Sequence, residues 1–248
     1  MASSKEEYCS KYFIPEEYLW EILEDAKVVP MIRGKATEYN AFLFLQTNLD
    51  KHVFSVDKLN LNAQTDEYDE DVSITHRATG VRLKVEVKNA VRGSFSTGQR
   101  AKFPYKDKPH FKVKCHRSRS NIALADTTND RYLPGEFDIV MSNVLNAIYE
   151  GATYTSEMQF IDRNAIELLK GYYHVTSNRD LEIAANQDWR FAFPDDIAEE
   201  CRGVMAIPRT PYVLLREDPH WFSFDRLPEL LERRAIEMAK ERKKKGRY

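Results

Sequence analysis

The sequence predicts a mixed α/β (α+β) fold, in which a mixed central β-sheet is flanked by helices. Three observations support this prediction. Residues 81–88 alternate between apolar and charged side chains, which is typical of a strand with one buried face. Residues 137–149 (FDIVMSNVLNAIY) form an apolar run that is typical of a buried central strand. Helix-like patterns occur on both sides of these strands, at residues 15–27, 37–49, 162–169 and 227–245.

Two helices are predicted at the start of the chain. Residues 15–27 have an acidic beginning and apolar side chains at helical spacing. A second helix is predicted over residues 37–49, after Pro30 and Gly34, and its few polar residues indicate that it is buried. Glu38 lies in the first turn of this predicted helix, where the helix dipole favours a carboxylate. This position explains Glu38 without a function, and a catalytic role is the alternative.

A β-hairpin is predicted next, after a strand within residues 52–63. Gly80 in the turn can adopt a positive φ, so the strand that starts at Asp71 folds back beside residues 81–88. Glu86 and Lys88 are two residues apart and therefore point to the same side of the sheet. The hairpin brings the carboxylates of Asp71 and Glu86 into one site. Asp69 competes for this role, and Asp71 is preferred because it directly precedes the apolar alternation.

Charge is distributed unevenly along the chain, although the formal net charge is only −2. Residues 1–70 contain fourteen Asp and Glu against seven Lys and Arg. Residues 82–121 contain twelve Lys and Arg, and their only acids are Glu86 and Asp107. Phosphates are attracted to such a basic surface without regard to sequence. The positive block therefore predicts nucleic-acid binding, and a solvated positive face is the alternative.

The residues predicted to contact DNA lie in this basic block. A long loop at residues 91–110 and a strand with an alternating pattern at residues 111–116 supply hydrogen-bond donors and cations. The candidates are Arg92, Ser94, Ser96, Gln99, Arg100, Lys102, Lys112, Lys114, Arg117, Arg119 and Asn121.

The sequence around this hairpin resembles the PD-(D/E)xK nuclease superfamily, which includes the Type II restriction endonucleases. The resemblance consists of an acidic residue, Asp71, followed by a hairpin and by a Glu-x-Lys motif formed by Glu86 and Lys88. The proline of that motif is missing here, since Glu70 precedes Asp71. The resemblance covers about residues 32–145. It implies a single nuclease domain over residues 1–248, with a restriction-endonuclease-like core and a C-terminal elaboration at about residues 150–248.

A chemical role for each motif residue follows from phosphodiester hydrolysis and from this resemblance. Asp71 and Glu86 are hard oxygen ligands suited to Mg²⁺, which also binds the scissile phosphate and the attacking water. Lys88 orients or deprotonates that water, and burial beside a metal lowers its pKa. The resemblance implies that Glu38 helps to bind the metal or a metal-bound water.

The function predicted from these features is that of a Type II restriction enzyme, which cuts double-stranded DNA at a short specific sequence. The resemblance also implies a homodimer and a cognate DNA methyltransferase. One alternative is a structure-specific nuclease of DNA repair or recombination. Another is a nucleic-acid-binding protein without catalysis, in which the acids are only surface charge.

Other classes of protein are disfavoured by what the sequence lacks. His76, His110, His116 and Cys115 have no partners at zinc-ligand spacing. The three cysteines are isolated, and the start of the chain has no apolar signal-peptide core. No stretch approaches the roughly 20 apolar residues of a membrane span. These observations predict a cytoplasmic protein without a membrane segment.

Overall fold

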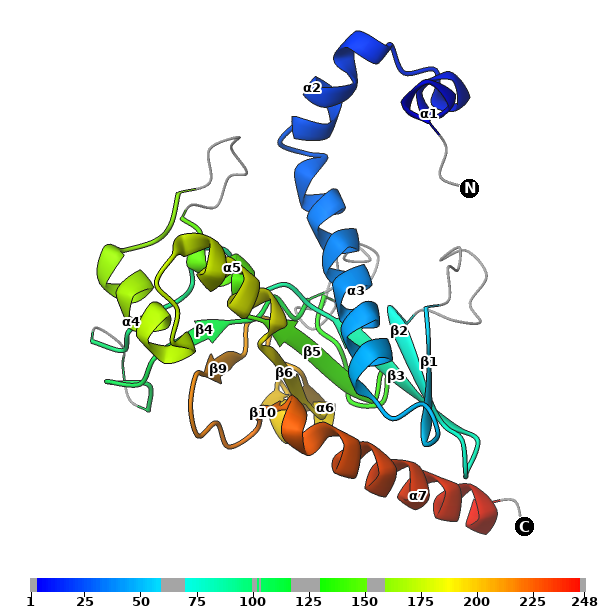
Figure 1. Cartoon of the computed structure of the whole chain (residues 1–248). Coiled ribbons are helices and arrows are strands. Elements are labelled where there is room, and N and C mark those ends of the chain that lie inside the picture. Colours follow the sequence, from blue (N-terminus) through cyan, green and yellow to red (C-terminus); the bar gives the residue numbers. More distant parts are fainter. Residues whose placement is uncertain are drawn as a thin grey trace.

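The structure of this chain, a computed structural model, describes residues 4–58, 70–99, 102, 104–116, 130–150 and 159–245. This part of the chain has a mixed α/β architecture with a mixed six-stranded sheet, which confirms the predicted fold class (Figure 1). In spatial order, the strands of the main sheet are β1 (Phe54–Asp57), β2 (Val72–His76), β3 (Val81–Val87), β5 (Ile139–Asn143), β6 (Trp189–Ala192) and β10 (Phe222–Ser223). The two smaller sheets pair β4 (His110–Lys112) with β9 (Tyr212–Leu214), and β7 (Glu199–Cys201) with β8 (Val204–Ala206).

The hairpin of β2 and β3 forms as the alternation predicts. The two strands are antiparallel, and Val72 lies opposite Val85. Gly80 in the connecting turn has a φ of 66°, a conformation that glycine adopts without strain. Strand β5 then pairs with β3 in parallel, with Val85 opposite Ile139. The strand that carries Glu86 is therefore held on both edges.

The helices differ from the sequence predictions mainly near the N-terminus. The α-helices are α1 (Lys5–Tyr12), α2 (Leu19–Glu24), α3 (Val29–Asn48), α4 (Arg163–Tyr173), α5 (Asn178–Gln187), α6 (Pro194–Ile197) and α7 (Leu227–Lys245). The 3₁₀ helices are η1 (Glu16–Tyr18), η2 (Leu145–Ile148) and η3 (Phe224–Arg226). The bounds predicted for α7 are confirmed, whereas the single helix predicted over residues 15–27 is replaced by η1 and α2. Helix α1 and the β7–β8 hairpin had no predicted counterpart.

The start of α3 changes the explanation of Glu38. The helix begins at Val29, with Pro30 in its first turn, where the missing N–H needs no partner. Gly34 lies inside the helix, so neither residue breaks it. Glu38 is consequently in the middle of α3, and the prediction that it occupies the first turn is wrong. The helix dipole does not explain its position, because that effect is confined to the first and last turns.

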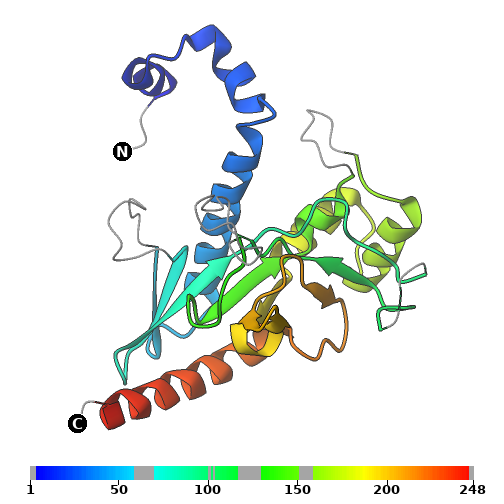
Figure 2. The same cartoon turned by 180° about the vertical axis from the view of Figure 1, so that it is seen from behind.

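Two apolar cores cover the two faces of the main sheet. On one face, α3 and α7 pack through Ala41, Leu45 and Leu231 against alternate residues of the strands, such as Leu83. On the other face, α4, α5 and the β4–β9 pair surround a core that contains Val140 of β5. Figure 2 shows the same elements from behind, with α7 running along one edge of the molecule.

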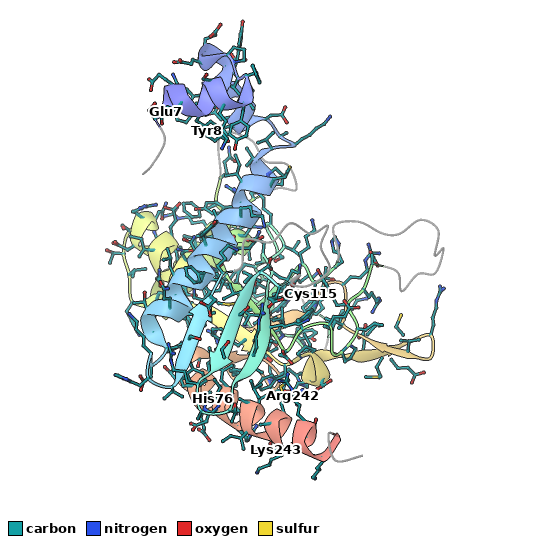
Figure 3. The ribbon with its side chains drawn as sticks, turned by 90° about the vertical axis from the view of Figure 1, so that its right-hand side faces the viewer. Glu7, Tyr8, His76, Cys115, Arg242 and Lys243 are labelled. Atoms are coloured by element: carbon teal, nitrogen blue, oxygen red, sulfur yellow. The ribbon has the colours of Figure 1, made fainter. Side chains whose placement is uncertain are left out.

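Helices α1 and α2 lie apart from this layered body. Figure 3 shows Glu7 and Tyr8 of α1 at one extreme of the molecule, and Arg242 and Lys243 of α7 at the other. Within the described residues, every helix is too short or too polar to cross a membrane.

Candidate active site

Asp71, Glu86 and Lys88 come together at one end of the β2–β3 hairpin. The register that sets Val72 opposite Val85 continues outward, so the next pair is Asp71 and Glu86. The backbone N–H of Val87 donates to Asp71 Oδ2 at 2.9 Å. Glu86 Oε1 forms an ion pair with Lys88 Nζ, as expected for side chains on one side of a strand. The three residues of the predicted motif thus share one site.

Tyr132 joins this group from a distant part of the chain. Its hydroxyl donates to Glu86 Oε1 at 2.9 Å and accepts from Lys88 Nζ at 2.9 Å. Lys88 Nζ also lies 4.9 Å from the centre of the Tyr132 ring, which is cation–π geometry. Tyr132 therefore holds the carboxylate and the ammonium group together. Tyr132 was not predicted from the sequence, because it belongs to no motif.

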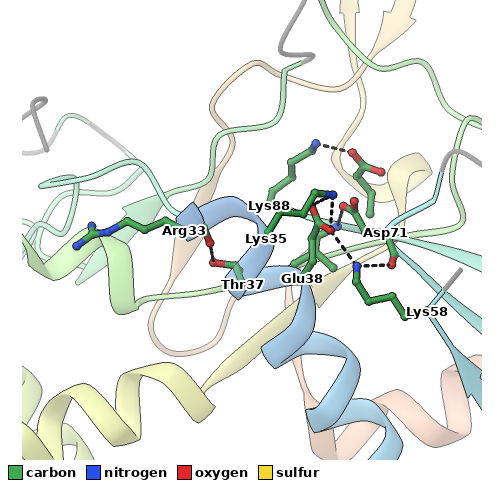
Figure 4. A network of polar contacts seen from close by, with 9 residues as sticks. Arg33, Lys35, Thr37, Glu38, Lys58, Asp71 and Lys88 are labelled. Carbon is green, nitrogen blue, oxygen red and sulfur yellow. Dashed lines mark hydrogen bonds and ion pairs between the residues drawn. The ribbon is translucent and has the colours of Figure 1, made fainter. Parts of the chain in front are cut away.

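Glu38 reaches the same site from α3 and is held there by two lysines. Glu38 Oε2 lies 2.8 Å from Lys35 Nζ and 2.9 Å from Lys58 Nζ (Figure 4). Lys58 Nζ also donates to the backbone carbonyl of Asp71 at 3.2 Å. The Lys58 side chain is only 8% exposed, so this contact fastens α3 to the start of β2. Lys58 is a second residue that the sequence analysis missed.

A cavity of about 400 Å³ is lined by Glu38, Asp71, Glu86, Lys88 and Tyr132, among other residues. Its walls are rich in carboxylates, and cations lie among them. The acidic lining residues are Glu38, Glu70, Asp71, Glu86 and Glu136, and the basic ones are Lys84, Lys88, Lys114 and His116. The cavity thus combines groups that bind a cation with groups that bind a phosphate.

Asp71 carries the most perturbed carboxyl group of the site. Burial and the negative charges of Glu86 and Glu38 raise the pKa of Asp71 to about 7, although the Val87 N–H and Lys88 act in the opposite direction. The Asp71 carboxyl group is therefore protonated part of the time at neutral pH. A bound cation relieves this kind of repulsion between carboxylates.

Lys88 is a protonated cation in this arrangement. Burial alone would lower the pKa of Lys88, but the negative charge of Glu86 and the hydrogen bonds to Glu86 and Tyr132 raise it above its ordinary value. The lowered pKa expected from the sequence is not observed. Lys88 is thus suited to orient a water or to stabilise an anion, and a proton-accepting role has no support from this geometry.

The acidic pair at the hairpin fits a hard divalent cation. Asp71 and Glu86 provide carboxylate oxygens from adjacent strands, and Mg²⁺ is often bound through one or two carboxylates while it keeps several waters. Among the described residues, no group of three His, Cys, Asp or Glu side chains forms a ready metal site. Binding through Glu86 therefore requires this carboxylate to give up part of its contact with Lys88.

The other acids near Asp71 have different environments. Glu70 forms an ion pair with Arg82 and accepts from the Ser73 hydroxyl at 2.9 Å, so its Oε1 atom is already engaged. Asp69, the competing candidate, lies outside the described residues. Asp71 keeps its place as the preferred ligand because it faces Glu86 across the hairpin.

The residues predicted to contact DNA fall into three groups. Lys112 and Lys114 project from the same side of one extended segment, and Lys114 lines the cavity. Gln99 and Lys102 are exposed. The third group makes hydrogen bonds within the protein: Arg92 Nε donates to the Glu150 carbonyl, Ser94 Oγ accepts from the Lys112 N–H, and Ser96 Oγ accepts from the Gly98 N–H. Four further candidates lie outside the described residues, namely Arg100, Arg117, Arg119 and Asn121.

The residues considered for zinc lie in separate environments. His76 contacts the hydroxyl of Thr79, and His110 contacts the carbonyl of Lys108. Cys115 is fully buried in the core, and burial raises the pKa of its thiol to about 12. A thiol of this kind is not a nucleophile at neutral pH.

In comparisons with known proteins, no family model, curated protein or solved structure matched this chain.

Proposed function

We propose that this protein is a Mg²⁺-dependent endonuclease that hydrolyses double-stranded DNA at a short specific sequence, as Type II restriction enzymes do. The observation that carries the proposal is the meeting of Asp71, Glu86, Lys88 and Glu38 in one cavity. Glu38 lies on α3 and Glu86 on β3, while Asp71 directly precedes β2 and Lys88 directly follows β3. In the superfamily that the sequence resembles, the motif residues occupy a helix and two adjacent strands in the same way, and we infer a restriction-endonuclease-like core on that basis.

Asp71 and Glu86 are the proposed metal ligands, and Glu38 is the proposed acceptor for a water bound there. A Mg²⁺ ion held by Asp71 and Glu86 would lower the pKa of a water molecule and would neutralise charge on the phosphate. Lys88, as a cation beside Glu86, attracts the phosphate oxygens and stabilises the charge that develops during attack. Tyr132 keeps Lys88 and Glu86 in position through its hydroxyl.

The DNA backbone is proposed to follow the positive segment that leads into the cavity. Lys112 and Lys114 lie on one side of this segment, and His116 lines the cavity next to Lys114. The two lysines neutralise phosphates and position the duplex but do not read bases. Binding through them weakens as salt is added, because counterions are released from the DNA.

The test is cleavage of unmethylated phage DNA by the wild-type protein and by Glu86→Ala, with and without Mg²⁺, followed by gel electrophoresis. Discrete bands from the wild type, only with Mg²⁺, are expected. Glu136→Ala is a matched control, because Glu136 lines the same cavity but lies outside the motif. It is expected to retain cleavage.

Other outcomes separate the alternatives. Mg²⁺-dependent cleavage by Glu86→Ala at the wild-type rate would overturn the proposed site. Cutting confined to branched or nicked DNA would replace restriction with repair or recombination. Intact DNA that is retarded on the gel equally with and without Mg²⁺ would indicate a binding protein without catalysis.

A further inference from the structure

A second cavity, of about 160 Å³, lies between α3, the end of β5 and α5. Arg33, which lines this cavity, extends from α3 away from Asp71 and Lys58 of the candidate active site (Figure 4). Asn89, which follows β3, lines both cavities. The second cavity is therefore a neighbour of the first, on another side of the same helix.

Amide side chains dominate the polar lining of this second cavity. Its asparagines, after which we call it the asparagine cavity, are Asn40, Asn89, Asn143, Asn146 and Asn186. Among the described residues that line it, Arg33 is the only charged one. The Arg33 guanidinium group is already engaged, because Nη1 donates to Asn146 Oδ1 at 3.3 Å and Cζ lies 5.9 Å from the centre of the Tyr149 ring. The cavity thus offers hydrogen bonds with little net charge.

Hydrogen bonds within the protein hold part of this lining in place. Asn146 Nδ2 donates to the Ala90 carbonyl at 2.6 Å. The Thr37 hydroxyl donates to Asn89 Oδ1 at 2.7 Å, which connects α3 to the segment after β3. A ligand would therefore enter a cavity whose walls are already positioned, and less free energy is lost on ordering them.

Other amide atoms of the asparagine cavity remain available. Within the described part of the chain, Asn89 Nδ2, Asn186 Nδ2 and both polar side-chain atoms of Asn40 have no hydrogen-bond partner. Asn40 therefore offers a donor and an acceptor side by side. Polar groups of this kind are satisfied by water or by a ligand.

Tyr149 gives the cavity a flat apolar wall. Its ring is stacked on Phe160, with the ring centres 5.4 Å apart and the planes 20° apart, and the residue is buried. A cavity of about 150 Å³ in another protein accommodates a benzene ring, so the volume found here suits a six-membered aromatic ring. The bases of nucleic acids stack on aromatic side chains of this kind.

The chemistry of these walls disfavours several kinds of ligand. A divalent cation is bound mainly through carboxylates or imidazoles, and the described lining residues include neither. A phosphate would have only Arg33 as a cation, and Arg33 is engaged. A wholly apolar ligand would leave the Asn40 amide unpaired. A neutral, flat ligand with donors and acceptors along its edge fits best.

We propose that the asparagine cavity binds a nucleobase, with adenine as the preferred base. An asparagine amide pairs with adenine through two hydrogen bonds, in which it accepts from the N6 amino group and donates to N7. Asn40 has both atoms available for such a pair. The free amide donors of Asn89 and Asn186 suit the ring nitrogens, and Tyr149 provides the surface for stacking.

The base can come from two sources. One is a DNA substrate in the candidate active site, from which a base is turned out of the stack into a pocket of the protein, and this source rests on the proposed function. The other is a free nucleotide, bound independently of DNA. Asn89 favours the first source, because it makes the two cavities neighbours.

The experiment is calorimetric titration of the full chain with deoxyadenosine monophosphate (dAMP), without Mg²⁺. Saturable binding is expected. Thymidine monophosphate (dTMP) should bind roughly tenfold more weakly, because it cannot form the paired contacts with an asparagine amide. Deoxyribose 5-phosphate, which has no base, should not bind.

Three variants connect this binding to the asparagine cavity. Ala36→Phe should abolish it, since Ala36 is an exposed residue of α3 that lines the cavity and a larger side chain there fills the space. Asn40→Asp should change the preference from dAMP to deoxycytidine monophosphate, because a carboxylate accepts from the cytosine N4 amino group but cannot donate to adenine N7. Asn48→Asp is the matched control on the same helix, outside the lining, and should bind like the wild type. Circular dichroism verifies that each variant is folded.

Saturating duplex DNA, again without Mg²⁺, distinguishes the two sources. Loss of dAMP binding, together with weaker binding of the duplex by Ala36→Phe, would identify the occupant as a base of DNA. Undiminished dAMP binding in the presence of the duplex would identify it as a free nucleotide.

Other results would overturn the proposal. One is the absence of saturable dAMP binding at millimolar concentration. Another is equal binding of dAMP, dTMP and deoxyribose 5-phosphate, which would mean that the phosphate alone is bound. A third is wild-type affinity for dAMP in Ala36→Phe. None of these results would bear on cleavage of DNA, which is measured separately with Glu86→Ala.

Discussion

Five carboxylates line the candidate cavity, and three of them, Glu38, Asp71 and Glu86, differ in how their charge is balanced. Cations pair with Glu38 and Glu86, whereas Asp71 has no such partner among the described residues. Glu38 lies within 3 Å of the ammonium groups of Lys35 and Lys58. Glu86 is paired with Lys88. Asp71, among the described residues, accepts a hydrogen bond from the Val87 N–H and forms no ion pair. Burial and the two neighbouring carboxylates accordingly raise its pKa to about 7.

This difference indicates where the site is incomplete. A buried carboxylate without a nearby cation is costly, and the structure compensates for this cost at Glu38 and Glu86 but not at Asp71. A divalent cation between Asp71 and Glu86 would supply the missing charge. It would also compete with Lys88 for Glu86, so that the Lys88 ammonium group becomes available to a phosphate.

The largest expected effect is that of Lys88→Ala, which removes the cation that balances Glu86. Under the proposed function, the rate of DNA cleavage should fall by roughly 1,000-fold, because Lys88 acts on charge that develops in the transition state. DNA affinity should change little, since the other cations of the basic segment still contact phosphates. Single-turnover cleavage and a binding assay without Mg²⁺ measure the two quantities separately.

Lys84→Ala is the matched control for that variant. Lys84 lies on the same side of β3 and lines the same cavity, but it is outside the motif. Its loss should leave the rate within a few-fold of wild type. Equal rates for Lys88→Ala and the wild type would remove Lys88 from the proposed chemistry.

The hairpin was predictable because its signal is local. Each strand of the β2–β3 pair has one side in the apolar core, so the period of two in the sequence fixes which side Glu86 and Lys88 occupy. The helix α7 was predictable for a similar reason, since its apolar stripe is continuous. The start of α3 was not, because Pro30 and Gly34 are read as breakers unless their positions within the helix are known.

The contacts that complete the site were not predictable. Tyr132 and Lys88 are 44 residues apart in the sequence, and Lys58 and Glu38 are 20 apart. Neither pair has a characteristic spacing, because their approach depends on how α3 and the segment before β5 pack on the sheet. The motif therefore predicted the acidic residues of the site, whereas the tertiary packing determines which cations lie beside them.

Smaller effects are expected on the free energy of unfolding, and substitutions of Asp71 and Glu38 should change it in opposite directions. Asp71→Asn should raise the free energy of unfolding by about 2 kcal/mol at pH 8 without Mg²⁺, because it removes a charge that folding makes costly. Glu38→Gln should lower it by about 1–3 kcal/mol, since the buried Lys58 loses its partner. Urea unfolding measures both. If both substitutions changed the free energy of unfolding in the same direction, the proposed difference in charge balance between Asp71 and Glu38 would be wrong.

The free energy of unfolding should also depend on pH through Asp71. The pKa of Asp71 is raised from its ordinary value of 3.8, so the charged form is disfavoured in the folded state. Its cost to stability is absent below about pH 4, grows as the pH rises toward 7 and is constant above that. Asp71→Asn should lack this component. Under the proposed function, Mg²⁺ should stabilise the wild type at pH 8 but not the variant.

The smallest effect is expected from Tyr132→Phe, which keeps the ring but removes the hydroxyl between Glu86 and Lys88. Two hydrogen bonds of 2.9 Å are lost, and the proposed role in positioning predicts a decrease in kcat of about tenfold. KM for DNA should stay the same, while the Mg²⁺ concentration for half-maximal rate should rise, because Glu86 is less well oriented. Tyr105→Phe is the control, since Tyr105 stacks on Tyr212 outside the lining of this cavity. A change in unfolding free energy without any change in kcat or in the Mg²⁺ dependence would mean that Tyr132 only supports the fold.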